Sequence, residues 1–144
     1  MRRFATIAAT ICLAAAPAAL AARTLSYQGF TSQGHEIKFK RTSAGVSRMA
    51  ITVRASCANA NGQNQGDYDF TLKATDPNAD KVRGGRFTTF LSGEDQVPDA
   101  TIKGKFNARG VARGTIAASG KAKGPKGEDL GTCKSSTVRW TAGP

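Results

Sequence analysis

Residues 100–118 read ATIKGKFNARGVARGTIAA, and this stretch carries the clearest structural signal in the chain. On both sides of residues 107–110, apolar or small side chains alternate with Thr, Lys and Arg. A period of two places successive side chains on opposite faces of an extended strand. The tetrapeptide NARG at 107–110 supplies residues that tight turns favour. The stretch therefore predicts an antiparallel hairpin with a buried core beneath a basic exterior.

The same period of two recurs across most of the chain after residue 22. The longest example, residues 49–57, places Met, Ile, Val, Ala and Cys on one face. Shorter runs cover residues 25–31, 36–40 and 67–74, and segments rich in Gly, Ser or Asn separate them. We therefore expect an all-β fold of about eight short antiparallel strands, arranged as a β-sandwich or a closed barrel.

The first 21 residues have the three parts of a secretory signal peptide. Arg2 and Arg3 precede an uncharged, alanine-rich run, and residues 19–21 offer the small-x-small pattern that signal peptidase cleaves. A transmembrane anchor is the alternative, but the run is barely long enough and a proline interrupts it. We therefore expect cleavage near Ala21 and a single β domain over residues 22–144. That domain would have no further membrane span and would be secreted or periplasmic.

The chain is strongly basic, with 21 Lys and Arg against 10 Asp and Glu, a formal net charge of +11. Such a charge attracts polyanions, although it also keeps a domain soluble and protects sheet edges. Aromatic and basic side chains alternate on opposite faces, which argues against a nucleic-acid stacking platform. The candidate anion-binding residues are the basic side chains that should point outward or lie in a lysine-rich loop. They are Lys38, Lys40, Arg48, Arg54, Lys73, Lys103, Lys105, Lys121, Lys123 and Lys126.

Three cysteines occur, and Cys12 lies within the predicted leader. Cys57 and Cys133 remain, and an even pair in an oxidising compartment predicts a disulfide. The alternatives are a metal pair or a catalytic thiol. A metal site needs more ligands, and the single His is distant in sequence. We therefore expect a stabilising bridge worth about 4 kcal/mol, and neither a metal nor a cofactor.

Residues 131–140, GTCKSSTVRW, contain one of these cysteines and the only tryptophan. In a regular strand Cys133 and Trp140 would point to opposite faces, so one of them would be exposed. A bulge near Ser135 and Ser136 would let both side chains be buried. The bridge to Cys57 would then tie the last strand to an early one.

Two motifs that suggest chemistry lack most of what that chemistry requires. Residues 76–80 (DPNAD) begin like an EF-hand loop, but Lys81 and Phe87 stand where that loop needs Gly and Glu. Residues 120–127 (GKAKGPKG) lack the Ser or Thr and the following helix of a nucleotide-binding loop. We expect an Asp-Pro turn in the first segment and a mobile loop in the second.

Four segments together resemble small secreted bacterial β domains of uncharacterised function. They are YQGFTSQG at 27–34, IKGKF at 102–106, VARGTI at 111–116 and GTCKSSTVRWTA at 131–142. The resemblance covers most of the chain after the leader and consists mainly of glycines, core aromatics and the cysteine pair. It implies a fold, and it implies no activity and no functional residues.

The sequence favours a non-enzymatic binding or interaction module, with an anionic polysaccharide or lipopolysaccharide of the cell envelope as the leading partner. Nucleic acid is disfavoured. The alternative is an envelope-directed hydrolase that uses His35 and the loop carboxylates at 94–95 and 128–129, although no nucleophile motif is present. A third hypothesis is a protein-interaction domain, which would require an exposed apolar patch.

Overall fold

The computed structural model describes residues 23–74, 80–93 and 96–144, and this part of the chain is built from nine β-strands. In chain order they are β1 (Leu25–Thr31), β2 (Glu36–Arg41), β3 (Val46–Ala58), β4 (Asn64–Lys73), β5 (Arg86–Leu91), β6 (Asp99–Phe106), β7 (Ala112–Lys123), β8 (Asp129–Lys134) and β9 (Val138–Gly143). Every pairing between them is antiparallel. The predicted all-β antiparallel fold is confirmed, with nine strands where about eight were expected. Within these ranges no helix is long and apolar enough to cross a membrane.

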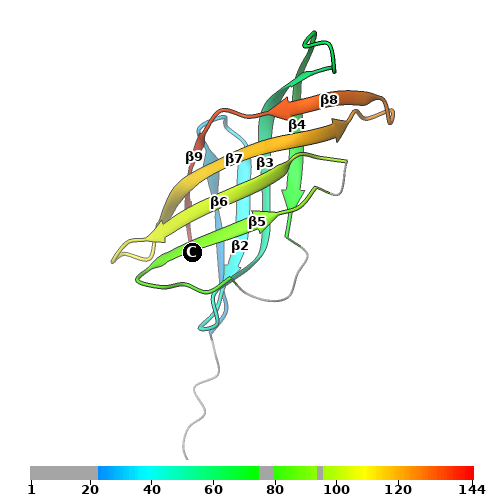
Figure 1. Cartoon of the computed structure of the whole chain (residues 1–144). Coiled ribbons are helices and arrows are strands. Elements are labelled where there is room, and N and C mark those ends of the chain that lie inside the picture. The colour runs from blue at the N-terminus through cyan, green and yellow to red at the C-terminus, as the bar shows by residue number, and fades with distance from the viewer. Residues whose placement is uncertain (1–22, 75–79, 94–95) are drawn as a thin grey trace, which may run out of the picture.

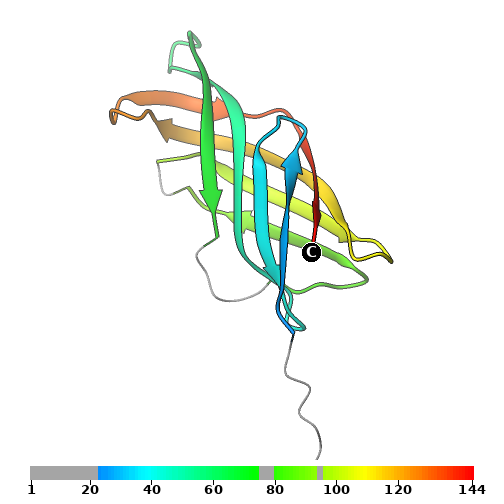
Figure 2. The same cartoon turned by 180° about the vertical axis from the view of Figure 1, so that it is seen from behind.

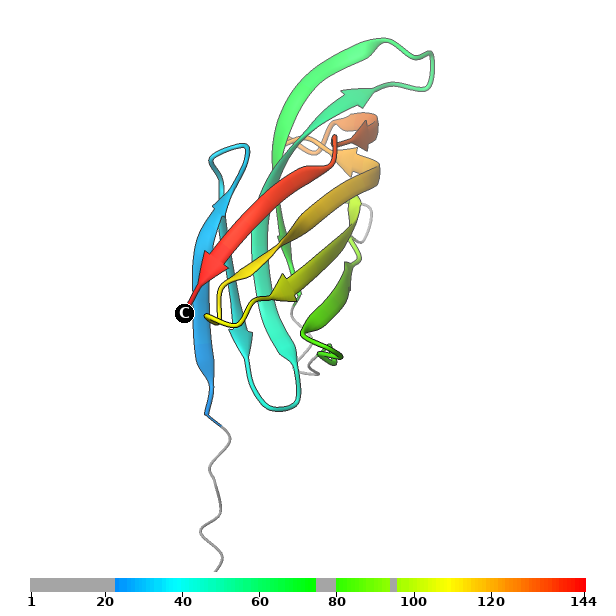
Figure 3. The same ribbon diagram turned by 90° about the vertical axis from the view of Figure 1, so that its left-hand side faces the viewer.

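The nine strands form one sheet that folds over on itself. Hydrogen-bonded neighbours follow the order β4-β3-β2-β1-β9-β7-β6-β5, and β8 pairs with both β3 and β7. Strands β5, β6 and β7 cross in front of β1 to β4 in Figure 1 and behind them in Figure 2. Figure 3 shows β9 (red) beside β1 (blue), where the sheet passes from one layer to the other. The layers face each other as in a sandwich, although the sheet that forms them is continuous.

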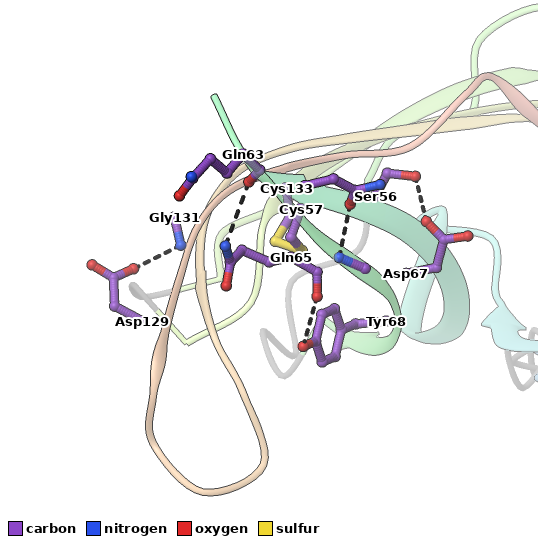
Figure 4. Close-up of a disulfide and its surroundings, with 11 residues drawn as sticks. Ser56, Cys57, Gln63, Gln65, Asp67, Tyr68, Asp129, Gly131 and Cys133 are labelled. Atoms are coloured by element: carbon purple, nitrogen blue, oxygen red, sulfur yellow. Dashed lines mark hydrogen bonds between the residues drawn. A yellow bond between two sulfur atoms is a disulfide. The ribbon is translucent and has the colours of Figure 1, made fainter. Parts of the chain in front are cut away.

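A disulfide between Cys57 and Cys133 fastens β3 to β8. The two cysteines are direct partners in the ladder and lie 76 positions apart in the sequence. Because β8 also pairs with β7, the bridge joins the two layers. Figure 4 shows hydrogen bonds around the disulfide, among them the one within β8 that the Gly131 N–H donates to the Asp129 carboxylate at 2.8 Å. The predicted disulfide is thus present and closes the fold.

The break between β8 and β9 lets Cys133 and Trp140 both face the interior, where they are 0% and 2% exposed. Residues 135–137 belong to neither strand. Ser135 nevertheless stays against β7, because its N–H donates to the Ala118 carbonyl and its Oγ accepts from the Ala118 N–H, both at 2.9 Å. A bulge was predicted near Ser135, and the structure has instead a break between two strands, which also lets both side chains face the interior.

A cross-strand row of two glycines between two large rings lies at the centre of the core. Phe87 is opposite Gly104, Gly104 is opposite Gly114, and Gly114 is opposite Trp140. The rings lie over the glycines, since a Cβ at Gly114 would lie 2.6 Å from Trp140 Cζ2 and one at Gly104 would overlap Phe87. Phe39 from the other layer packs on both rings, with centroids 5.9 Å from Phe87 and 6.0 Å from Trp140. We term Phe87, Gly104, Gly114 and Trp140 the glycine row.

One prediction was wrong, and one strand has no predicted counterpart. Residues 120–123 are not part of a mobile loop, because they extend β7 and pair with β8. Their Gly and Lys content suggests a loop, but buried Ala122 and the partner strand hold them in the sheet. A turn occupies only residues 124–127. Strand β5 (Arg86–Leu91) was not among the predicted strands.

Several predictions fall on residues outside the described ranges. They are the signal peptide at 1–21, residues 76–79 of the Asp-Pro segment, and the carboxylates at 94–95.

We predict that Gly114→Ala lowers the free energy of unfolding by about 1–3 kcal/mol or more. The added methyl group would overlap the Lys103 carbonyl oxygen on β6 and lie 2.6 Å from Trp140 Cζ2, so the backbone and the ring must both move. Gly143→Ala is the matched control, since no heavy atom lies within 4 Å of a Cβ there. Urea denaturation followed by circular dichroism measures both variants. Equal stability of the two would contradict the packing described for the glycine row.

Replacing both Cys57 and Cys133 by Ser should lower the free energy of unfolding by about 2–5 kcal/mol, because the unfolded chain regains the freedom of a long loop. Urea denaturation with and without a reducing agent compares the stability of each protein before and after any disulfide is reduced. The reductant should destabilise the wild-type protein and leave the double variant unchanged. If the reductant leaves the free energy of unfolding of the wild-type protein unchanged, the bridge does not contribute to stability.

Candidate functional site

Positive side chains gather on the outer face of the layer that contains β5, β6, β7 and β9. The register places Arg86 opposite Lys105, and Lys105 opposite Arg113. Lys103 lies two residues from Lys105 on β6, and all of these side chains are exposed. Arg139 on β9 is also exposed and is separated from Lys103 only by a threonine of β7. The cationic face, as we term it, consists of Arg86, Lys103, Lys105, Arg113 and Arg139.

This arrangement does not stabilise the sheet. Neighbouring strands lie about 4.8 Å apart, and like charges directly opposite each other are destabilising. The ion pairs found among the described residues involve Arg54, Lys38 and His35, and none of them includes a residue of the cationic face. The row Arg86–Lys105–Arg113 is therefore a repulsive arrangement that the protein core holds in place.

A shallow hollow of about 240 Å³ lies within the cationic face. Arg86, Lys103, Lys105 and Arg113 surround it, together with Thr115 and the backbone of the two central glycines. Four cations around one depression create a positive potential that favours an anionic group there.

A larger hollow of about 420 Å³ lies on the outer side of the other layer, at β1 and β2. Lys38, Lys40 and Arg48 line it, and Arg48 has a positive φ of 51°, which L-residues rarely adopt. Lys38 is bound to Glu36 at 2.8 Å, and Gln28 donates to the same carboxylate. The Lys38 hydrogen bond holds the pKa of Glu36 below its usual range. We term this larger hollow the groove. Its net positive charge is smaller than its three cations, Lys38, Lys40 and Arg48, would suggest.

Arg54 is engaged by a carboxylate on the neighbouring strand. Its Nε and Nη2 donate to the two oxygens of Asp69 at 2.8 and 3.1 Å. This hydrogen-bonded pair holds the pKa of Asp69 below its usual range, and the nearby His35 acts in the same direction. The predicted anion-binding role of Arg54 is thus weakened by a partner within the protein.

The other predicted lysines are dispersed. Lys73 ends β4, and Lys121 and Lys123 lie at the far end of β7 where it pairs with β8. Lys126 lies in the following turn, where its N–H donates to Glu128 at 2.9 Å. The structure therefore brings together two groups of the predicted residues, Lys38, Lys40 and Arg48 in the groove, and Lys103 and Lys105 on the cationic face.

Arg86, Arg113 and Arg139 were missed as site residues. The alternation around Arg113 and Arg139 does predict that both point outward, so a local signal existed for these two. The predicted hairpin of β6 and β7 places Arg113 beside Lys105. The sequence does not reveal the pairing of β6 with β5 or of β7 with β9, and these pairings place Arg86 and Arg139 on the same face.

His35 lies directly before β2, with its Nε2 3.3 Å from Asp69 Oδ1 but without hydrogen-bond geometry. No hydrogen bond found in the described residues joins its ring to a hydroxyl group. Glu128 and Asp129 accept hydrogen bonds from the backbone of their own turn, at Lys126 and Gly131. Within these ranges no group of three or more His, Cys, Asp and Glu residues could hold a metal ion.

No family model, curated protein or solved structure matches this chain. The assignment of a function therefore depends on the geometry and charge of the surfaces described above.

We predict that Asp69→Asn lowers the free energy of unfolding at pH 7 by up to about 1 kcal/mol, the range of an exposed ion pair. Because the folded-state pKa of Asp69 is depressed, its contribution is present above the unfolded-state pKa and is lost as pH falls below about 4. Urea denaturation at pH 7 and at acid pH should show wild type and variant converging on acidification. A constant difference would contradict the Arg54–Asp69 assignment.

Proposed function

We propose that this protein is a non-enzymatic binding module whose cationic face binds an anionic polymer. The proposal depends on one observation, the cross-strand row Arg86–Lys105–Arg113, which lies opposite no acidic side chain. A row of exposed like charges costs stability, so a ligand that neutralises it accounts for its presence. Lys103 and Arg139 widen the positive surface to a second row.

The cationic face suits an extended ligand better than the groove does. Its charges repeat in two directions, about 4.8 Å from strand to strand and about 6.8 Å along a strand. A polymer with regularly spaced phosphate, sulfate or carboxylate groups can contact several of them at once. The groove offers Lys40 and Arg48, while Lys38 is already engaged by Glu36.

The predicted export of the protein narrows the class of polymer. A leader at residues 1–21 would deliver the chain to the periplasm or the exterior, and the Cys57–Cys133 bridge is compatible with that compartment. Anionic polysaccharide and lipopolysaccharide are the polyanions that a secreted or periplasmic protein would meet, and we propose them as partners.

A hydrolase is the second candidate, and the contact between His35 and Asp69 is the observation in its favour. A histidine oriented by a carboxylate is a common element of acid–base catalysis. We place it second because Arg54 binds both oxygens of Asp69, so the carboxylate already has a structural partner.

Binding of heparin by the purified protein tests the proposed function. Replacing Lys103 and Lys105 by Gln should weaken binding about tenfold at low salt, at about 1 kcal/mol or less for each cation. The control is Lys40→Gln with Lys73→Gln, which removes the same charge from the other layer and should have a smaller effect. Wild-type affinity should fall as salt is added.

Two results would contradict the proposal. A wild-type protein that does not bind heparin at low salt would exclude polyanion binding of this kind. Equal losses in the two double variants would show that binding follows net charge and that the cationic face is not the site.

A further inference from the structure

The two large hydrophobic side chains that are most exposed in the described part of the chain border the cationic face. Phe90 and Phe30 are each 64% exposed. Phe90 lies on the same strand and the same face as Arg86. Phe30 lies opposite Thr141, which in turn lies opposite Arg113. Apolar rings thus lie at two borders of a positively charged surface.

The Phe90 ring projects from the outer face of the sheet at a place where its cross-strand neighbours have short side chains. Its cross-strand neighbour is Thr101, and Thr101 lies opposite Ala117, so short side chains flank the ring along this row. A hollow of about 290 Å³ lies there, lined by Phe90, Asp99, Ala100, Thr101, Ala117 and Ser119. The Asp99 carboxylate accepts a hydrogen bond from the Gly93 N–H at 2.9 Å. In a ladder of this kind Lys103 and Asp99 are the two diagonal neighbours of Phe90, roughly 7–8 Å away. An apolar ring and a cationic head group therefore project side by side.

We infer that the cationic face docks on an anionic membrane surface, with Phe90 entering the boundary between lipid head groups and acyl chains. The inference rests on the proposed function, because the same lysines and arginines would contact the lipid phosphates. Basic side chains near an anionic bilayer are attracted to its phosphates, and an apolar side chain that leaves water strengthens the attachment. Phe30 would lie at the border of the same contact.

A lipid surface explains these features better than a soluble polymer. An exposed phenyl ring gains free energy by leaving water, and hydrocarbon accepts it without any hydrogen-bonding partner. Single-stranded nucleic acid stacks its bases on successive aromatic rings, whereas Phe90 has only Thr101 and Ala117 along its cross-strand row. A projecting ring with no facing wall suits a deformable apolar medium more than a rigid ligand.

Sedimentation with vesicles of equal parts phosphatidylglycerol and phosphatidylcholine tests the inference, with phosphatidylcholine vesicles and heparin as parallel arms. Phe90→Ala should weaken binding to the anionic vesicles about tenfold, as expected for an apolar side chain that leaves water. It should leave heparin binding unchanged. Thr88→Ala, on the same face of β5 between Arg86 and Phe90, is the control and should retain binding to both.

The outcomes separate this inference from the proposed function. The lipid assignment would be overturned if the protein binds heparin but not vesicles, or if Phe90→Ala does not weaken vesicle binding. Either result would leave the proposed polyanion binding intact. Equal losses toward heparin and vesicles would show that Phe90 contacts the polymer, and would also overturn it. A wild-type protein that binds neither would overturn both proposals.

Discussion

Phe87 and Trp140 pack over two glycines, and this contact sets the alignment of four neighbouring strands. Gly104 and Gly114 are direct partners, and the flanking rings occupy the space that side chains would otherwise fill. This packing fixes the register of β5, β6, β7 and β9 together. Because side chains alternate, the residues next to the glycine row must point outward. Arg86, Lys105 and Arg113 are those residues, so the core also places the charges.

Arg86, Lys105 and Arg113 repel one another across neighbouring strands. The fold tolerates this repulsion because its two layers are joined at several places. Phe39 packs on both rings of the glycine row, and the Cys57–Cys133 bridge joins β3 to β8. Each exposed like-charge pair costs a few tenths of a kcal/mol to about 1 kcal/mol, whereas one buried aromatic side chain contributes more. Repulsion on the surface therefore does not separate the strands, and the charges remain available to an external partner.

The sequence predicted the features that depend on local order. Alternation identified most strands and the outward direction of Lys103 and Lys105. The parity conflict between Cys133 and Trp140 predicted a bulge near Ser135, where the structure has a break between β8 and β9. Features set by distant partners were not predictable. Residues 120–123 belong to β7 because β8 supplies hydrogen bonds to a segment that resembles a loop. Likewise, no local pattern places Arg86 beside Lys105, since that contact requires β5 to pair with β6.

Residue-by-residue mapping of the ligand contact would show whether the cationic face is the binding surface. Amide resonances of the labelled protein can be followed by nuclear magnetic resonance while a heparin oligosaccharide is added at low salt. We expect the largest shifts to cluster on β5, β6, β7 and β9 around Lys105, with Arg54 on β3 little affected. Shifts concentrated at the groove formed by Lys40 and Arg48, or spread evenly over the surface, would contradict it.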